Sequence, residues 1–167
     1  MNSLKHILLV EDKSKDVKLI VAALAEYNLA NGVAVARDGV EALDYLYCRG
    51  KFAGRANGDP VLVMLDNKMP KLNGLEVLRD IKAHPRLKSI PVVMLTSSRE
   101  EPDLLESYKL GVNAYVVKPV DFTQFGEAIK QVGVFWALLN ELPHRAPPQE
   151  TKQPSDELQG AKEKGLQ

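Results

Sequence analysis

The chain has little that would tie it to a membrane, an oxidising compartment or nucleic acid. Its 167 residues include one cysteine, Cys48, which excludes an internal disulfide and suits the reducing cytoplasm. No apolar stretch approaches the roughly 20 residues of a spanning helix, and the N-terminus has no signal-peptide pattern. Lys plus Arg number 22 and Asp plus Glu also 22, so no excess charge favours nucleic acid or anionic lipid. We therefore expect a cytoplasmic protein with no membrane partner.

Short apolar segments alternate with longer segments of helical periodicity. The apolar segments predict strands at His6–Val10, Gly32–Ala36, Val61–Leu65, Pro91–Leu95 and Ala114–Val117. The periodic segments predict helices at Ser14–Tyr27, Gly39–Cys48, Gly74–Ala83, Glu101–Leu110 and Phe122–Leu142. Regular alternation predicts an α/β fold, because parallel strands need long crossovers that place helices on both faces. The expected fold is a doubly wound, five-stranded parallel sheet of flavodoxin-like strand order 2-1-3-4-5.

Residues 1–142 are expected to form one domain, followed by a flexible tail over residues 143–167. The tail is rich in Pro, Gln, Glu and Lys and has little to bury. It also lacks the apolar residues of a helix-turn-helix, so no DNA partner is expected. The segment Arg49–Asp59 is longer than a helix-to-strand turn requires, with three glycines and three basic residues. A solvated loop and a contact surface for a partner both remain open for it.

Three carboxylates are expected to meet at the edge of the sheet where the strands end. Glu11 and Asp12 follow the first strand, and Asp66 follows the apolar run of the third, its neighbour in the predicted order. Repulsion among them would raise the pKa of at least one carboxyl group. A hard cation relieves that repulsion, and Mg²⁺ suits one or two carboxylates, waters and phosphate oxygens. The pattern predicts a Mg²⁺ site at this edge.

Two further polar residues, Thr96 and Lys118, close the fourth and fifth strands at the same edge. A hydroxyl group there can donate to a phosphoryl oxygen, and an ammonium group can neutralise its charge. Asp66, at the end of the third strand, is central in this arrangement and can attack phosphorus to form an acyl phosphate. The five residues together therefore predict phosphoryl transfer to an aspartate.

These residues lie in motifs that resemble the receiver domain of bacterial two-component response regulators. The resemblance covers about Lys5 to Leu142. The matching segments are Leu9-Val10-Glu11-Asp12, Asp66-Asn67-Lys68-Met69-Pro70 with Gly74, Thr96-Ser97-Ser98, and Ala114-Tyr115-Val116-Val117-Lys118-Pro119.

The resemblance implies a role for each matching position. Asp66 would be the phosphoacceptor, and a histidine kinase would supply the phosphoryl group. Mg²⁺ would be held by the Glu11, Asp12 and Asp66 carboxylates and by the Asn67 backbone carbonyl. We thus expect a signalling phosphoprotein that catalyses only its own phosphorylation and dephosphorylation.

The resemblance also implies which residues change position when Asp66 is phosphorylated. Thr96 and Lys118 would bind the phosphoryl group, and Tyr115 would swing inward as Thr96 moves. The changed surface would then be read by a downstream protein that the sequence does not identify. The Lys118–Pro119 peptide would be cis, an isomer whose cost is small only before proline.

The chain departs from the family pattern near the metal. Glu11 stands where aspartate is commoner, and Lys13 and Ser14 stand where many members have Asn-Pro. Lys68, two residues past Asp66, occupies a position that tunes the lifetime of the phosphorylated state in the family. None of these changes removes a residue that the chemistry requires.

The long Arg49–Asp59 segment and the apolar end of the last helix resemble stand-alone regulators that partner phytochrome-type histidine kinases. An apolar stripe is predicted to cover the sheet, with members Phe122, Phe125, Ile129, Val132, Trp136 and Leu139. Phe135, Leu138 and Leu142 lie on its flank. Either the helix end folds against its own domain, or the surface of the fourth and fifth helices forms a homodimer, which we favour. Gly126 and Gly133 lower helix propensity and suggest close approach of another backbone.

Three other functions compete with phosphorylation-driven signalling. A phosphorelay intermediate would pass the phosphoryl group from Asp66 to a histidine phosphotransfer protein. A metal-dependent hydrolase with an aspartyl-phosphate intermediate would need a second acid at the position of Lys68. A flavodoxin-type flavin module would need a loop rich in glycine and hydroxyls at Glu11–Ser14, which is acidic instead.

Overall fold

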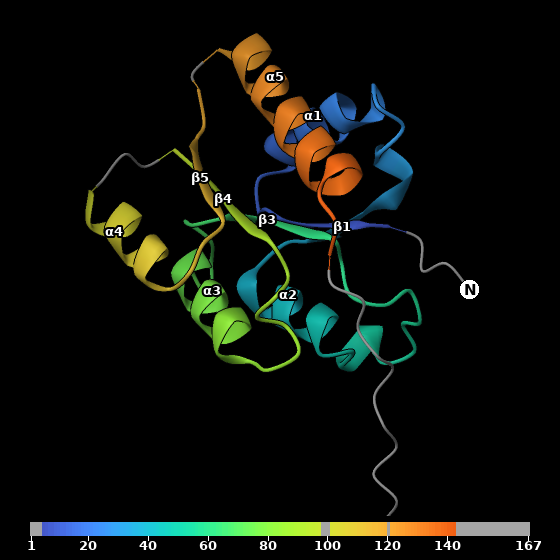
Figure 1. Ribbon diagram of the computed structural model, residues 1–167, viewed down its shortest axis with the longest axis vertical. Helices are drawn as coiled ribbons and strands as arrows, with labels where there is room; N and C mark the ends of the chain where they lie inside the picture. The colour runs from blue at the N-terminus through green and yellow to red at the C-terminus, as the bar shows by residue number, and fades with distance from the viewer. Residues whose placement is uncertain (1–4, 98–100, 120, 143–167) are drawn as a thin grey trace, which may run out of the picture.

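Five parallel strands form a single sheet in the computed structural model, which describes residues 5–97, 101–119 and 121–142. The strands are β1 Ile7–Val10, β2 Val33–Ala36, β3 Leu62–Asp66, β4 Val92–Thr96 and β5 Ala114–Val117. Their order is β2-β1-β3-β4-β5, and every neighbouring pair is parallel (Figure 1). This arrangement confirms the predicted doubly wound α/β fold, with strand bounds within one residue of those expected. The predicted tail, 143–167, lies outside the described residues.

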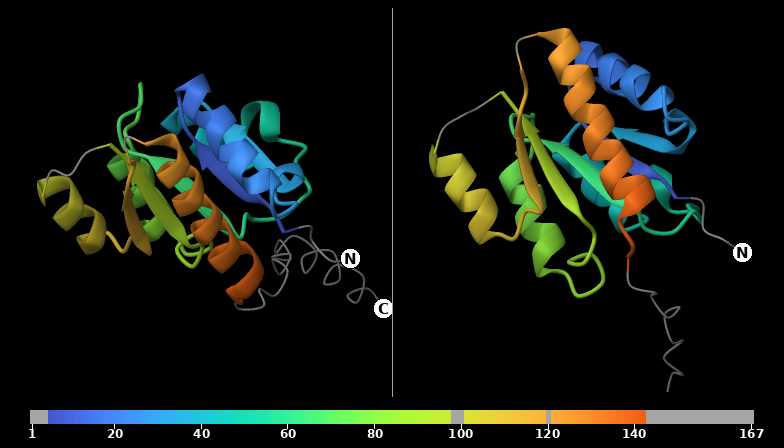
Figure 2. Two further views of the ribbon diagram at one scale, coloured as in Figure 1. Left: turned by 90° about the horizontal axis from the view of Figure 1, so that it is seen from above. Right: turned by 45° about the horizontal axis from the view of Figure 1, so that its top comes forward.

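Helices cover both faces of the sheet (Figures 1 and 2). The α-helices are α1 Ser14–Ala25, α2 Gly39–Leu46, α3 Gly74–Ala83, α4 Glu101–Lys109 and α5 Phe122–Gly133. Two 3₁₀ turns, η1 Ala30–Gly32 and η2 Gly50–Phe52, and a π-helical segment, η3 Val134–Leu139, complete the elements. Helices α1 and α5 lie together on one face, and α2 and α3 lie on the other, with α4 beside β5. Among the described residues, no helix has the length and apolar character needed to cross a bilayer.

The two faces of the sheet bury separate apolar cores. Along β1, Ile7 and Leu9 pack with α1 and α5, whereas Leu8 and Val10 pack with α2 and α3. None of these four side chains is more than 2% exposed. Successive side chains of a strand point to opposite faces, so a strand covered on both sides must be apolar at every position. This explains the unbroken apolar runs of the sequence.

The end of the last helix differs from the prediction. The α-helical geometry stops at Gly133, six π-helical residues follow, and Asn140 donates its backbone N–H to the Phe135 carbonyl at 2.8 Å. In this i→i+5 pattern each turn holds more residues, so the inward-facing positions shift along the chain. Ala137 is buried, whereas Leu139, predicted on the inner stripe, is 67% exposed.

The predicted apolar stripe is also wrong at its start, where Phe122 is 56% exposed. Of the two glycines of α5, only one is closely approached by another part of the chain. A Cβ on Gly133 would lie 2.5 Å from Cδ2 of Leu24, so α1 and α5 approach closely there, through a side chain rather than a backbone. A Cβ on Gly126 would meet nothing within 4 Å, so close approach does not explain that glycine.

The segment Arg49–Asp59 is folded back onto α2. The Arg55 guanidinium lies 4.1 Å from the ring centroid of Tyr45, and its Nε donates to the Tyr45 carbonyl at 3.0 Å. Asn57 donates to the Tyr45 hydroxyl at 3.1 Å. The segment therefore has its own packing around one aromatic ring, which a freely solvated loop would lack.

Helix α3 begins directly against the end of β3. Asn73 caps the helix by accepting from the Glu76 backbone N–H at 2.9 Å, and the Glu76 carboxylate accepts from the Asn73 N–H at 2.8 Å. Gly74 donates its N–H to the Asn67 carbonyl at 2.8 Å. A Cβ on Gly74 would lie 2.5 Å from the Asp66 carbonyl oxygen and 2.7 Å from Cα of Asn67. Only glycine lets the helix approach the strand end this closely.

We expect Gly74→Ala to lower the free energy of unfolding by about 1–3 kcal/mol, because the new methyl group overlaps backbone atoms that have no rotamer to change. Gly126→Ala is the matched control and should raise it by about 0.5–1 kcal/mol, since alanine favours the helix and its methyl group has space. Urea denaturation of the two variants measures both changes. Equal effects of the two substitutions would contradict this account of Gly74.

Candidate functional site

Three carboxylates lie together at the edge where the strands end. Glu11 and Asp12 follow β1, and Asp66 is the last residue of β3. Because Val10 pairs with Leu65 in the register of these neighbouring strands, the acidic residues fall at one level. One oxygen from each of the three lies within 4.8 Å of the others. Glu11 is only 1% exposed and Asp66 only 4%.

Lys118, after β5, places its ammonium group among these acids. Its Nζ lies 2.6 Å from Oε2 of Glu11, 2.9 Å from Oδ2 of Asp16 and 3.5 Å from Oδ1 of Asp66. The Lys118 backbone N–H donates to the Thr96 carbonyl at 2.8 Å, which joins the ends of β4 and β5. Asp16 was not predicted from the sequence. Its position in the first turn of α1 is the only sequence signal, and that position alone does not reveal the contact.

Burial controls the electrostatics of the cluster. Burial raises the pKa of Glu11 above its usual range, more than the hydrogen bond from Lys118 lowers it. Burial also raises the pKa of Asp66, with the charge of Asp12 adding to the effect and that of Lys118 opposing it. Burial lowers the pKa of Lys118, but its hydrogen bond to Glu11 and the charge of Asp66 outweigh this and raise it. Lys118 therefore stays an ammonium at neutral pH, and negative charge exceeds positive charge around it.

The oxygens of the cluster fit a hard divalent cation. Oδ1 of Asp12 is buried and has no hydrogen-bond partner, which is costly for a carboxylate unless a cation or water meets it. The Asn67 carbonyl accepts one hydrogen bond, from Gly74, and its second lone pair remains. Carboxylate and carbonyl oxygens are the ligands that Mg²⁺, Ca²⁺ and Mn²⁺ prefer. Glu11, Asp12, Asp66 and the Asn67 carbonyl are the groups that would hold such an ion.

The other predicted residues lie on β4 and β5. Thr96 ends β4 at the same edge and is fully buried. Tyr115 lies in β5 and packs, partly buried, against the core beneath α2 and α3. The Lys118–Pro119 peptide is trans, since no cis bond occurs among the described residues, so the expected cis isomer is wrong for this structure. Trans is the lower-energy isomer even before proline.

Asn67 connects the site to α4. Its side-chain Nδ2 donates to Oδ2 of Asp103 at 3.3 Å, across the gap between β3 and α4. Asp103 was also missed from the sequence, because the contact depends on where α4 lies rather than on any local pattern. Lys68, two residues past Asp66, is exposed.

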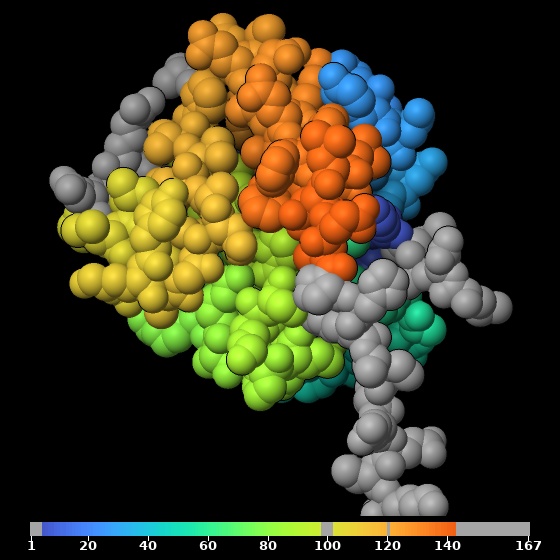
Figure 3. Space-filling model, viewed as in Figure 1, coloured from blue at the N-terminus to red at the C-terminus, as the bar shows by residue number. Residues whose placement is uncertain are grey.

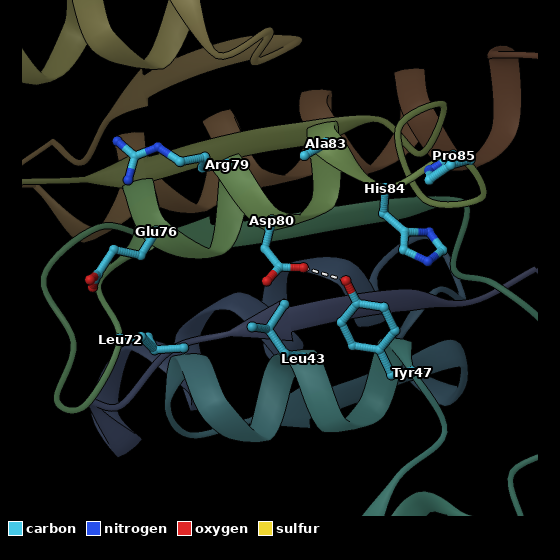
Figure 4. A pocket seen from close by; sticks show the side chains of 9 residues that line it. All are labelled: Leu43, Tyr47, Leu72, Glu76, Arg79, Asp80, Ala83, His84 and Pro85. Atoms are coloured by element: carbon cyan, nitrogen blue, oxygen red, sulfur yellow. Dashed lines mark hydrogen bonds between the residues drawn. The ribbon is translucent and has the colours of Figure 1, made fainter.

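A groove of about 510 Å³ lies elsewhere, between α2 and α3 (Figure 4). In it the Tyr47 hydroxyl donates to Asp80, and the Tyr47 and His84 rings meet edge to face with centroids 5.2 Å apart. The hydrogen bond to Asp80 is among the causes that raise the pKa of Tyr47, after burial. None of the clustered acids lines this groove. The groove is therefore separate from the strand-end cluster.

Comparison with known proteins identifies the family of the chain. Residues 7–130 match the family described as the response regulator receiver domain. Response regulator Rcp1 of Synechocystis sp. is 37% identical over 142 residues, covering 85% of this chain and 95% of Rcp1. Its solved Mn²⁺-bound form has a TM-score of 0.78 at 36% identity, covering 84% of this chain and 99% of that one.

Two further solved structures are similar. The phosphorylated cyanobacterial phytochrome response regulator RcpA is 41% identical with a TM-score of 0.78, covering 84% of this chain and 99% of that one. The bacteriophytochrome response regulator AtBRR is 61% identical with a TM-score of 0.66, covering 83% of this chain and 99% of that one. The whole described sheet and its helices are thus shared with receiver structures.

We expect Asp66→Asn to raise the free energy of unfolding at neutral pH, in the absence of divalent cations, by about 0.5–2 kcal/mol. The folded-state pKa of Asp66 lies above its unfolded value, so folding favours the protonated form. The stability of the wild type is therefore greatest below the unfolded pKa and falls as pH rises through the folded one. The difference between variant and wild type should close as the pH is lowered towards 4. Urea denaturation with chelator across this pH range measures it, and a constant difference would contradict the assignment to Asp66.

Proposed function

This chain belongs to the response regulator receiver family, and on that basis we propose that Asp66 accepts a phosphoryl group from a histidine kinase. Proteins of this family are signalling proteins rather than classical enzymes. The observation that carries the proposal is the meeting of Asp66 with Glu11, Asp12 and Lys118 at one buried edge of the sheet. We assign the receiver domain to residues 1–142, of which the family match covers 7–130.

In the proposed reaction a carboxylate oxygen of Asp66 attacks phosphorus. An acyl phosphate bond forms as the bond from phosphorus to the histidine nitrogen breaks, and the electron pair of that bond stays on the imidazole. Such a transfer needs in-line placement and neutralised phosphoryl oxygens rather than further covalent chemistry. Lys118 supplies a positive charge 3.5 Å from Asp66, and Thr96, buried at the same edge, supplies a hydroxyl group.

We assign Mg²⁺ as the cation of this site. Glu11, Asp12, Asp66 and the Asn67 carbonyl offer it oxygen ligands, and Mg²⁺ shares its coordination readily with phosphate oxygens. When bound, the ion would supply positive charge to the phosphoryl group and offset the repulsion among the acids. The Mn²⁺-bound form of Rcp1 supports a divalent cation in this family.

Signalling would follow from a changed surface. Thr96 moves toward the phosphoryl group, and Tyr115, partly buried in the neighbouring strand, follows it inward. This local event biases an element with two arrangements, which a partner protein reads.

The similarity to RcpA and AtBRR supports a phytochrome-type histidine kinase as the phosphoryl donor. We place the exchange in the cytoplasm, where the free thiol of Cys48 stays reduced.

Incubation with a small-molecule phosphodonor tests the chemistry directly. We expect intact-mass spectrometry to show a gain of one phosphoryl group in the wild type with Mg²⁺, and none with chelator. Asp66→Asn should gain none under either condition. A folded wild type that is never modified, or an Asp66→Asn variant modified to the same extent, would refute Asp66 as the acceptor.

We further propose that the protein forms a homodimer through α4 and the end of α5. Apolar side chains are exposed on both elements: Leu105, Tyr108, Phe135, Leu138 and Leu139, each at least 49% accessible. The end of α5 lies on the surface in the space-filling view (Figure 3). Clusters of exposed apolar side chains of this kind typically mark interfaces.

Leu139→Glu should weaken such a dimer at least about ten-fold, because it places a charge in an apolar contact. Leu139 is a better target than Trp136, whose side chain packs partly against the core. Tyr27→Glu, at an exposed apolar residue after α1, is the control and should leave the dimer unchanged. Sedimentation velocity over a concentration series gives the dissociation constants. A wild type that stays monomeric, or equal weakening by both variants, would refute the interface.

A further inference from the structure

Asp16 shares the ammonium group of Lys118 with the metal-site acids but stands outside their cluster. Its carboxylate lies 2.9 Å from Nζ of Lys118, and its side chain is 21% exposed, against 10% for Lys118. It projects from the first turn of α1, three residues after the loop that carries Glu11 and Asp12. Lys118 thus lies between two acids, Glu11 and Asp16, and is farther from the third, Asp66.

The hydrogen bonds of Glu11 create a competition. Its Oε1 accepts from the Lys13 backbone N–H at 3.1 Å, and its Oε2 accepts from Lys118 at 2.6 Å. Both oxygens are therefore engaged, and a cation that takes Glu11 as a ligand must share Oε1 with the Lys13 N–H or Oε2 with Lys118, whose ammonium group lies close by in either case. The two positive charges also repel one another in this buried setting. Binding of a cation and release of Lys118 by Glu11 are consequently linked.

Asp16 offers Lys118 a partner that the cation does not use. If Lys118 keeps Asp16 when it leaves Glu11, a buried ammonium group is never left without a counter-charge, which would be costly. The same contact restrains Lys118 from moving fully onto Asp66, at 3.5 Å the longest of its three ion pairs. Both effects favour the cation at Glu11, Asp12 and Asp66.

We infer that Asp16 is a positioning residue, which holds Lys118 aside so that a divalent cation can bind beside it. The inference rests on the proposed function, because that cation is the one the phosphoryl transfer would use. A simpler account is that Asp16 only adds negative charge near the site. The two accounts differ in whether the effect of Asp16 requires Lys118.

Isothermal titration of Mg²⁺ into the full chain distinguishes them. Asp16→Asn and Lys118→Gln are made singly and together, so that the coupling between the two side chains can be measured. We expect Asp16→Asn to weaken Mg²⁺ binding about five-fold when Lys118 is present, and less than about two-fold in the Lys118→Gln background. Asp16→Glu, which keeps the charge, should restore affinity to within about two-fold of the wild type.

Glu26→Gln is the matched control. It removes an acid just past the other end of α1, whose partner is Lys130 at 2.5 Å, and should leave Mg²⁺ affinity unchanged. An equal loss with and without Lys118 would overturn the positioning role, as would an unchanged affinity in Asp16→Asn. Failure of the wild type itself to bind Mg²⁺ would instead refute the proposed metal site, so the two failures are distinguishable.

Discussion

The structure of the site depends on an imbalance of charge: three carboxylates at one buried edge of the sheet share the ammonium group of Lys118. Glu11, Asp16 and Asp66 all contact Lys118, while Asp12 keeps a buried oxygen without a partner. In water, holding these charges close together would cost little free energy. At this edge they are costly, because apolar layers on both sides keep solvent away and raise the pKa of Glu11 and Asp66. The fold therefore places excess negative charge at this site even without a bound ligand.

The same ion pairs also fasten the edge of the sheet. Strand β5 is three places from β1 in the sheet order, yet Lys118 reaches Glu11 at 2.6 Å and so ties together the loops that follow these strands. Beneath them, the absence of a side chain at Gly74 lets α3 begin against the backbone of Asp66 and Asn67. The position of Asp66 is therefore fixed in two ways, by the ion pairs of Lys118 and by the close packing of α3 at Gly74. Precise placement of this kind is what an in-line transfer requires.

The sequence was sufficient for the parts of the molecule that local patterns determine. Strands buried on both faces must be apolar throughout, so their ends, and the polar residues at those ends, could be located. The π-helical end of α5 could not be located, because it depends on how α5 packs, including the contact of Gly133 with Leu24 in α1. Asp16 and Asp103 were missed for a related reason. Each acts through a partner that is distant in the chain, Lys118 for one and Asn67 for the other.

The contact of Asn67 with Asp103 adds a second route from the site to the surface. In the proposed switch Thr96 and Tyr115 would connect the site to β5, whereas this hydrogen bond connects the residue next to Asp66 directly to α4.

The exposed Arg79–Glu106 pair, at 3.5 Å, links α3 to α4 and contributes little to stability. A new charge on Asp66 would alter the surroundings of Asn67 and, through Asp103, the preferred position of α4. Because Leu105 and Tyr108 are exposed on this helix, the same movement would change the apolar surface that a partner meets.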